Sequence, residues 1–485
     1  MKRTLTVVHA LGLMLAVFSL AYLMPIVASL IYQDGTAIDF IYALVATASI
    51  GVVLWLVSYR HRGELSIRHG YLLVVAMWTA MPAVATLPLL LVLPDLSFTD
   101  AYFETMSGLT TTGATVLTGL ENLPPAINIW RHELNWLGGM GIIVLAVAIL
   151  PLLGIGGRQL FKAETPGPMK DAALTPRITE TARNLWLVYL AITLVCIAAL
   201  KIAGMNWLDA ICHAFAVMGL GGFSTYDASV GHFDSPVIEA ILIVFMLIAA
   251  MNFATHFLVW RGKTFKPYAH DKEGLATVGV IALSCVGIAA FLYQQGTYPN
   301  FWTALRHASF NLVSVATDCG FASQDFNLWP IFAPMWMLLL SSVVASSGST
   351  GGGIKMVRTL ILFKQAGREL HKLLHPAAVN PMKIGGAPIP NSVVFAVLGF
   401  IFLYFMTVVT LTFALLMSGL DFISAFSAII ACINNAGPGL GVVGPASNFG
   451  VLTNFQTWIC TIAMLVGRLE IFTVLILFTP QFWRR

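Results

Sequence analysis

The sequence predicts an all-α membrane protein with four pseudo-symmetric helix–pore-loop–helix repeats around a central pore, preceded by two N-terminal transmembrane helices. The first observation is composition: 58% of the 485 residues are hydrophobic and 10% are charged, whereas ordinary soluble chains carry about 25% charged residues. The second is a set of glycine-centred segments at near-regular spacing, with central glycines Gly113, Gly222, Gly320 and Gly437. Four similar units around one axis are one way in which a single chain builds a pore.

Composition also excludes several classes of protein. A soluble chain of this length would divide into two or more domains, and there are too few charged side chains to cover their surfaces. The net charge of +4 is small and evenly spread, so nucleic acid is not a predicted partner. The six cysteines show no C-x-x-C spacing, which argues against a metal site or a disulfide framework.

Ten apolar stretches have about the 20 residues that a transmembrane helix needs. They cover residues 5–31, 38–58, 71–93, 134–155, 185–203, 236–260, 275–293, 328–360, 391–418 and 453–480. The first follows Lys2 and Arg3, as in a signal sequence, but its length and the lack of a small-residue cleavage site predict a retained helix. With the N-terminus in the cytoplasm, 21 of the 26 Lys and Arg residues fall on the cytoplasmic side, as the positive-inside rule requires. We therefore expect a multi-pass protein with both termini in the cytoplasm.

The chain is expected to have five parts. They are residues 1–69 (two N-terminal transmembrane helices), 70–160 (pore repeat 1), 161–262 (repeat 2), 263–384 (repeat 3, with a broken second helix) and 385–485 (repeat 4). Acidic residues, Glu104 among them, gather on the external side. Acidic groups at a pore mouth raise the local cation concentration, but for most of these residues a solvated loop charge is the favoured interpretation.

An amphipathic stretch precedes each central glycine, beginning near Asp100, Asp209, Thr303 and Asp421. Asp and Thr suit a helix N-cap, where a side-chain oxygen accepts a free backbone N–H. A helix of about 10 to 14 residues is roughly 15–20 Å long, which is half a membrane. Each stretch is thus predicted to dip into the membrane and end in non-helical backbone, which is tolerated there only around a water-filled path or inside protein.

The glycine segments are predicted to form a selectivity filter. Backbone carbonyls can replace the water around a cation, and pointing successive carbonyls in one direction requires φ values that glycine accepts without strain. Glycines that serve only close helix packing are the alternative, which four segments in register disfavour. The candidate filter residues are Thr111, Thr112, Gly113, Leu220, Gly221, Gly222, Asp318, Cys319, Gly320, Asn435, Ala436 and Gly437.

The apolar stretch from residue 328 is interrupted by serines and glycines, which break a helix. It matches a phosphate-binding G-x-x-x-x-G-K motif only loosely and no strand precedes it, so a flexible loop in the permeation path is predicted instead. Such a loop is a candidate gate. Its candidate gating residues are Gly348, Ser349, Thr350, Gly351, Gly352, Gly353 and Lys355.

Arg468 lies in the middle of the last apolar stretch, where a charge costs at least about 2.5–3.5 kcal/mol. Glu470 is two residues away and does not share its helix face. We expect Arg468 to project into the conduction path below the filter, where its charge repels cations. A salt bridge with an acid of another helix is the alternative. For the side chain of Asp318, hydrogen bonds to nearby backbone N–H groups are favoured over cation ligation. His213 and His307 are expected to be packing residues.

These segments resemble the Trk/Ktr/HKT superfamily of potassium transporters, and within it the TrkH family, which supplies the membrane subunit of the bacterial Trk system. The resemblance covers nearly the whole chain and is carried by residues 110–115, 219–225, 317–321 and 434–439. It implies potassium as the transported ion, because glycine at all four filter positions accompanies potassium permeation in this superfamily. It also implies an intramembrane loop below the filter and an arginine in the path, here Arg468.

The resemblance further implies partners and a location. These are a homodimer, a cytosolic TrkA-like regulatory subunit that binds NAD and ATP, and membrane lipids in the bacterial cell inner membrane. No organic cofactor is expected in this chain.

Two other functions were weighed. An ion-coupled (H⁺ or Na⁺) secondary potassium symporter also fits broken helices and internal repeats, although a midplane acid and two- or threefold symmetry are missing from the pattern. A membrane enzyme needs a nucleophile–base or metal cluster, and no H-E-x-x-H or G-x-S-x-G motif lies in an apolar stretch. The chain is therefore not expected to be an enzyme.

Overall fold

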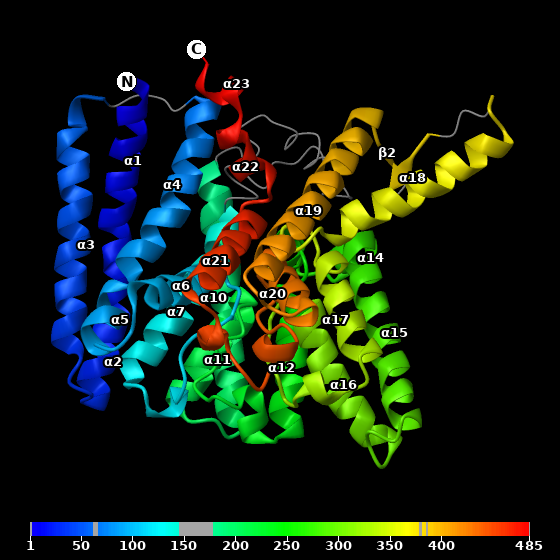
Figure 1. The fold of residues 1–485 in the computed structure, drawn as a ribbon, viewed down its shortest axis with the longest axis horizontal. Helices are drawn as coiled ribbons and strands as arrows, with labels where there is room; N and C mark the ends of the chain where they lie inside the picture. The colour runs from blue at the N-terminus through cyan, green and yellow to red at the C-terminus, as the bar shows by residue number, and fades with distance from the viewer. Residues whose placement is uncertain (1, 62–65, 145–177, 378–380, 385–386, 485) are drawn as a thin grey trace.

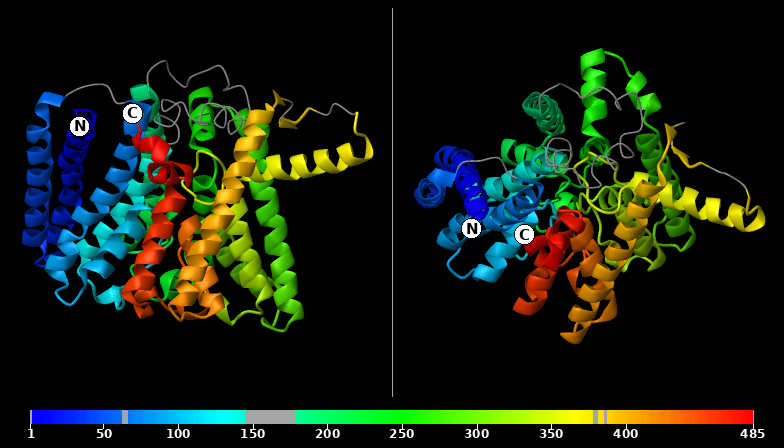
Figure 2. Two further views of the ribbon diagram at one scale, coloured as in Figure 1. Left: turned by 45° about the horizontal axis from the view of Figure 1, so that its top comes forward. Right: turned by 90° about the horizontal axis from the view of Figure 1, so that it is seen from above.

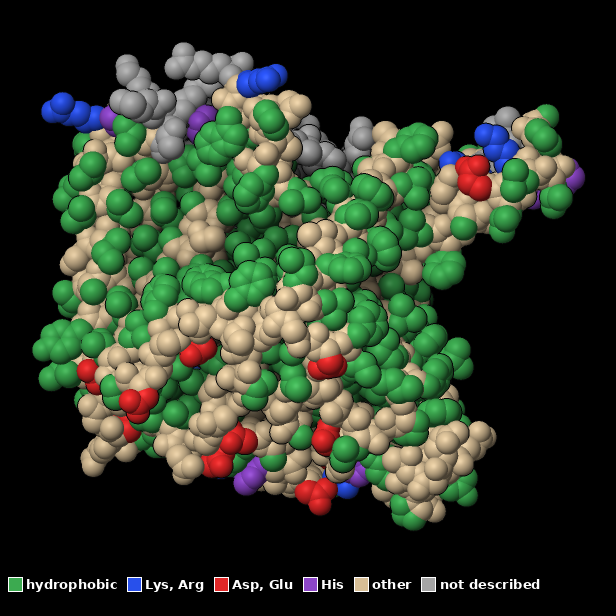
Figure 3. Space-filling model, viewed as in Figure 1, with side chains coloured by type: hydrophobic (Ala, Val, Ile, Leu, Met, Phe, Trp, Pro, Cys, Tyr) green, Lys and Arg blue, Asp and Glu red, His purple; other side chains and the backbone are tan. Residues whose placement is uncertain are grey.

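Helices that run side by side dominate the computed structural model (Figure 1), which describes residues 2–61, 66–144, 178–377, 381–384 and 387–484. Both chain ends lie on the same face. Lys and Arg side chains gather on that face, Asp and Glu on the opposite one, and hydrophobic side chains cover the surface between them (Figure 3). This distribution agrees with a protein that crosses a membrane several times. In the described residues, strands are limited to an antiparallel pair, β1 (Lys383–Ile384) and β2 (Ala387–Pro388).

The N-terminal unit stands at one edge of the molecule (Figure 2). Its helices are α1 (Lys2–Phe18), η1 (Ser19–Tyr22), α2 (Leu23–Tyr32), α3 (Ala37–Val57) and η2 (Tyr59–His61). Two glycines bring α1 and α3 into direct contact, since a Cβ atom on Gly12 would lie 2.6 Å from the Trp55 nitrogen and one on Gly51 would lie 2.5 Å from the Ala16 nitrogen. Small residues at such contacts let membrane helices approach closely.

Four repeats follow one another around a centre when the molecule is seen from above (Figure 2, right). Each repeat has an outer helix, a short pore helix, a glycine segment and an inner helix. Repeat 1 contains α4 (Ile67–Ala85), α5 (Leu87–Val92), α6 (Phe98–Leu109), η3 (Leu120–Asn122) and α7 (Pro125–Val144); repeat 2 contains α10 (Ile178–Ile202), α11 (Trp207–Gly219), η6 (Ser229–Phe233), α12 (Pro236–Ala249) and α13 (Phe253–Gly262). Repeat 3 contains α14 (Lys266–His270), α15 (Lys272–Gln294), α16 (Phe301–Ala316), η7 (Phe326–Leu328), α17 (Phe332–Val343) and α18 (Met356–Leu374). Repeat 4 contains α19 (Asn391–Met417), α20 (Phe422–Asn434), η8 (Gly441–Val443), η9 (Phe449–Val451), α21 (Asn454–Arg468), α22 (Phe472–Leu475), η10 (Ile476–Phe478) and α23 (Pro480–Trp483).

The pore helices begin earlier than predicted in three repeats. The N-caps are Ser97, Asn206 and Asn300, and only the expected Asp421 is a cap. Asp100, Asp209 and Thr303 lie three residues further on, where their backbone N–H groups donate to the cap side chains. The prediction was wrong there because Asp and Thr also suit the first turn, where acidic groups favour the positive end of the helix dipole. With these caps, the cap-to-glycine distance is 16 residues in three repeats (97 to 113, 206 to 222, 421 to 437) and one turn longer in repeat 3 (300 to 320).

Two predicted spans are wrong as continuous helices. Residues 236–260 bend by 95° between α12 and α13, and residues 453–480 bend by 106° between α21 and α22. At the first bend, Ser346 and Thr350 donate backbone N–H groups to the Ala250 and Ala249 carbonyls that the broken helix leaves free, at 3.2 and 3.3 Å. Long-range contacts of this kind leave no local sequence signal.

Other predicted spans are seen more directly. Six helices of the described residues are long and apolar enough to cross a membrane, or eight if each bent pair counts as one. Residues 328–360 are interrupted, since α17 ends at Val343 and α18 begins at Met356. The predicted boundary between residues 160 and 161, and the end of the predicted span 134–155, lie outside the described residues.

The contact between α1 and α3 generates a stability prediction. Gly51→Val should push the two helices apart and cost roughly 1–3 kcal/mol, as overpacking of a well-packed interface does. Thermal unfolding of the detergent-purified protein should show a lower midpoint for this variant. Gly279→Val is the matched control, because a Cβ atom at that helical glycine meets nothing within 4 Å; equal losses in the two variants would contradict the proposed close contact.

Candidate functional site

The four glycine segments meet head to tail around one axis. A Cβ atom on each central glycine would run into the carbonyl oxygen of the residue before the next glycine in the circle. The distances are 1.9 Å from Gly113 to Gly221, 2.1 Å from Gly222 to Cys319, 2.6 Å from Gly320 to Ala436 and 3.0 Å from Gly437 to Thr112. Because the fourth contact returns to the first repeat, the segments form a closed circle. We call the twelve candidate filter residues the glycine ring.

The backbone conformation is the same in all four repeats. Each central glycine has a positive φ, of 78°, 60°, 91° and 90° in chain order. The residue two positions before it is also left-handed: Thr111 (53°), Leu220 (53°), Asp318 (65°) and Asn435 (58°). Positive φ is uncommon in residues other than glycine. Here the left-handed residue is the C-cap of the pore helix in repeats 2 and 4 and follows the C-cap directly in repeats 1 and 3. The structure thus brings all twelve predicted filter residues together, and cation binding by them stays a prediction.

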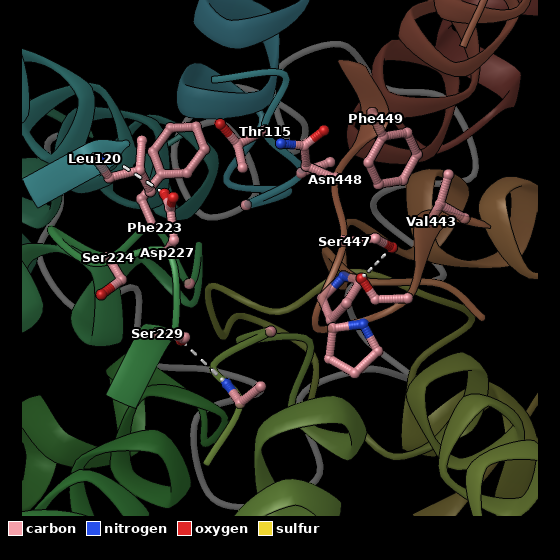
Figure 4. Close-up of a pocket in the computed structure, with 18 of the residues that line it drawn as sticks. Thr115, Leu120, Phe223, Ser224, Asp227, Ser229, Val443, Ser447, Asn448 and Phe449 are labelled. Carbon is pink, nitrogen blue, oxygen red and sulfur yellow. Dashed lines mark hydrogen bonds between the residues drawn. The ribbon is translucent and has the colours of Figure 1, made fainter. Parts of the chain in front are cut away.

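A cavity, which we call the outer cavity, lies next to the ring (Figure 4). Gly113, Gly222 and Gly320 line it, together with Pro438 of the fourth segment. Side chains from several repeats line its walls, including Thr115, Ser224, Ser229, Ser447 and Asn448 (Figure 4). Asp227 adds a carboxylate, which also accepts the backbone N–H groups of Gly119 (2.8 Å) and Leu120 (3.0 Å). The lining therefore combines oxygen atoms that can face a cation with apolar side chains such as Phe223 and with the side chain of Arg131.

The segment between α17 and α18, residues 344–355, closes the other side of the ring, and we call it the inner loop. Gly352 donates its backbone N–H to the Asp318 carboxylate at 3.0 Å, and a Cβ atom on Gly352 would lie 1.8 Å from the Asn434 carbonyl oxygen. Thr350 donates its hydroxyl to the Met218 carbonyl at 3.1 Å. Ser349 and Thr350 are buried. The inner loop thus lies against the ends of the pore helices of repeats 2, 3 and 4.

Arg468 is buried and contacts the inner loop directly. Its guanidinium donates to the carbonyl oxygens of Thr350 at 2.8 Å and Gly138 at 3.2 Å. In the part of the chain that the structure describes, no carboxylate forms a salt bridge with it; Glu470 instead pairs with Arg358 at 2.7 Å. Lys355 donates to the Gly351 carbonyl inside its own loop. The predicted gating residues therefore form one connected group, while their role in gating stays a prediction.

Asp318 joins the ring to the inner loop. One carboxylate oxygen accepts the Gly352 N–H, and the other has no partner within the described residues. The side chain does accept a backbone N–H, as expected, but from the inner loop and not from its own filter segment. It is fully buried.

Several buried carboxylates were not predicted to have a structural role, and two of them, Glu104 and Glu273, lie beside the ring and the inner loop. Glu104 belongs to the external acidic residues, for most of which a solvated loop charge is predicted. It is an exception, because its side chain is 1% exposed and pairs with Arg131 at 2.8 Å. No structural role was predicted for Glu273. One of its oxygens accepts the N–H groups of Ser347 (2.7 Å) and Val357 (3.2 Å), so that it holds both ends of the inner loop. A carboxylate inside an amphipathic pore helix was the available signal for Glu104.

The predicted packing histidines and the cysteines lie in the described residues. His213 bonds to the Ser224 hydroxyl at 3.0 Å and His307 is largely buried beside Tyr298. All six cysteines are buried and free. Across the described residues, no group of three or more His, Cys, Asp or Glu is arranged to hold a metal ion.

Comparisons with known proteins agree with this geometry. The family described as "TrkH: Cation transport protein" matches residues 37–485. The chain is 45% identical to the "Trk system potassium uptake protein TrkH" of Salmonella typhimurium over 479 residues, which is 99% of both chains. It is 40% identical to the "Trk system potassium uptake protein TrkG" of Escherichia coli K12 over 482 residues, covering 99% of this chain and 98% of that one. Among solved structures, "Crystal Structure of the Potassium Transporter TrkH from Vibrio parahaemolyticus" superposes with a TM-score of 0.91 at 43% identity and 99% coverage of both chains.

Proposed function

The chain belongs to the TrkH family of cation transport proteins, and from this premise we propose that it takes up potassium through a channel-like pore filtered by the glycine ring. The observation that carries the proposal is the closure of the ring. Four segments with one backbone conformation lie around one axis, each with a carbonyl oxygen packed against its neighbour's glycine. Main-chain oxygens arranged in this way replace the water that a potassium ion sheds.

The inner loop and Arg468 are proposed to form the gate. The inner loop is buried beneath the ring and the guanidinium is hydrogen-bonded to it. A positive charge at this depth repels an arriving cation, and a loop packed against the pore-helix ends leaves an ion no room to leave the ring. Opening then requires the loop to move and the Arg468–Thr350 hydrogen bond to break.

Control by a cytosolic nucleotide-binding subunit and assembly as a homodimer in the bacterial inner membrane are also proposed. The relatives are named as proteins of a Trk system, which supports a further component. Helix α18 projects away from the bundle (Figure 1) and exposes Phe363, Leu370, Leu373 and Leu374, a surface suited to a protein partner. It lies on the face that carries both chain ends, which we assign to the cytoplasm.

The second candidate is a potassium symporter coupled to H⁺ or Na⁺. The buried carboxylate of Asp318, which has one oxygen without a partner in the described residues, is the observation that favours it. The two candidates differ in whether potassium alone drives flux.

Reconstitution tests the proposal directly. In vesicles that contain only this protein, a potassium gradient should drive a current in the absence of proton and sodium gradients, because a pore needs no second ion. Flux would be recorded electrically at several potentials. Potassium movement that appears only with a proton or sodium gradient would support the symporter and contradict the pore.

Gly113→Ser tests the filter. A side chain at φ 78° with its Cβ 1.9 Å from the Gly221 oxygen must displace a ring carbonyl, so discrimination of K⁺ from Na⁺ should fall. Reversal potentials in asymmetric K⁺ and Na⁺ report the permeability ratio. Gly119→Ser is the matched control, with a similar φ of 65° and its nearest atom 3.7 Å away. A permeability ratio that stays at the wild-type value in Gly113→Ser would count against the ring as the filter.

Arg468→Ala tests the gate. Removing the guanidinium deletes its repulsion and its bond to the inner loop, so basal flux without any partner should rise, as it should after deletion within residues 348–353. Arg468→Lys should raise it less, because it keeps the charge. Arg261→Ala, at an exposed arginine on α13, serves as the control. Wild-type flux in both Arg468→Ala and the loop deletion would rule out this gate.

A further inference from the structure

Besides Asp209 of repeat 2 and Ser424 of repeat 4, each pore helix carries one buried polar side chain that bonds to the segment after its own glycine. In the first three repeats this side chain lies nine residues before the central glycine, and in the fourth it lies ten before. The four residues are Glu104, His213, Asn311 and Ser427. All four are buried, with exposed fractions of 0–1%.

The partners of these side chains lie two or three residues after each glycine. In repeat 1, the Glu104 carboxylate accepts the Thr115 hydroxyl at 2.9 Å and the Val116 N–H at 3.0 Å. In repeat 2, a ring nitrogen of His213 bonds to the Ser224 hydroxyl at 3.0 Å.

The same arrangement recurs in the other two repeats. In repeat 3, the Asn311 amide oxygen accepts the Ser323 N–H at 3.0 Å, and its nitrogen donates to the Ser323 hydroxyl at 3.0 Å. In repeat 4, the Ser427 hydroxyl accepts the Leu440 N–H at 2.8 Å. Four different residue types therefore make the same kind of hydrogen bond at similar places in the four repeats.

The physical reason is that the chain leaves the ring as extended backbone without helical hydrogen bonds. Buried backbone N–H groups and hydroxyls need partners, and no lipid group can supply them. A bond back to the pore helix fixes how far the outer end of each segment stands from the axis. Since the carbonyls of the ring belong to these same segments, the four bonds lie where they can affect the width of the ring.

Repeat 1 differs because its bond is charged and reaches a second repeat. Glu104 pairs with Arg131, whose guanidinium also donates to the Ser224 carbonyl of repeat 2 at 3.2 Å. The same guanidinium lies 4.4 Å from the centre of the Phe223 ring, the residue directly after Gly222. Charge-assisted hydrogen bonds are roughly twice as strong as neutral ones. This network joins the glycine segments of repeats 1 and 2.

We propose that Glu104, His213, Asn311 and Ser427 are positioning residues of the filter, and that the Glu104–Thr115 bond is a determinant of selectivity for potassium over sodium. The proposal rests on the function proposed above, since it requires the glycine ring to be the filter. A narrower or wider ring would coordinate potassium and sodium differently. Loosening the glycine segment of one repeat therefore changes the K⁺/Na⁺ permeability ratio and not merely the size of the current.

The test uses the full-length protein in vesicles and the K⁺/Na⁺ permeability ratio from reversal potentials. Thr115→Val removes the hydroxyl, which donates to Glu104 and also accepts N–H groups of Leu117 and Arg131, but it keeps the Glu104–Arg131 pair. It should lower the ratio by about fivefold, which is the factor in an equilibrium constant that corresponds to one intramolecular hydrogen bond. Thr115→Ser restores the hydroxyl and should restore the ratio. Glu104→Gln should lower the ratio too, and size-exclusion profiles show whether each variant folds.

Thr105→Val is the matched control. Thr105 is a buried threonine next to Glu104 on the same helix, and its hydroxyl bonds to the carbonyls of Pro82 and Ala101, away from the ring. Its ratio should stay at the wild-type value. A wild-type ratio in Thr115→Val, while Gly113→Ser lowers the ratio, overturns this inference and leaves the filter intact. A wild-type ratio in both overturns the filter as well.

Discussion

The closed contact between neighbouring glycine segments is the constraint on which the rest of the fold depends. Each central glycine leaves the space into which the next segment's carbonyl fits, and any Cβ atom there would lie within 3.0 Å of that oxygen. Four such contacts fix the spacing of four pore helices, and the pore helices in turn determine where the outer and inner helices can stand. Because non-helical backbone is tolerated at this depth only inside protein or around water, the surrounding helices must enclose it.

Buried charge follows from the same constraint. Extended segments and broken helices leave N–H and carbonyl groups that need partners, and charged side chains supply several of them. Glu104 holds the outer end of the first segment, Glu273 holds both ends of the inner loop, and Arg468 caps carbonyls of Thr350 and Gly138. Charges of this kind are costly in a membrane unless paired or hydrogen-bonded. Their positions therefore mark the places where the backbone leaves regular helix.

The sequence allowed the ring and the inner loop to be predicted, because glycine and serine act through local backbone freedom. It did not allow the bends after α12 and α21 to be predicted, because the first is completed by N–H groups of Ser346 and Thr350, about a hundred residues away. Three of the four N-caps were predicted one turn late, since Asp and Thr are equally suited to the first helical turn. Glu104 could not be distinguished from the solvated external charges, because hydrophobicity and position relative to the spans do not show which face of a pore helix is buried.

Asp318 connects the glycine ring to the inner loop. Its backbone belongs to the glycine ring, while its carboxylate is held by the Gly352 N–H of the inner loop. If the loop moves away in opening, this buried carboxylate loses its hydrogen-bond donor, and a buried unpaired charge is expensive. In the pore proposed above, a potassium ion at the inner end of the ring would supply the missing positive charge. Loop and ion would then compete for one carboxylate, and by the reciprocity of linked equilibria an ion bound there would favour the open loop as much as the open loop favours the ion.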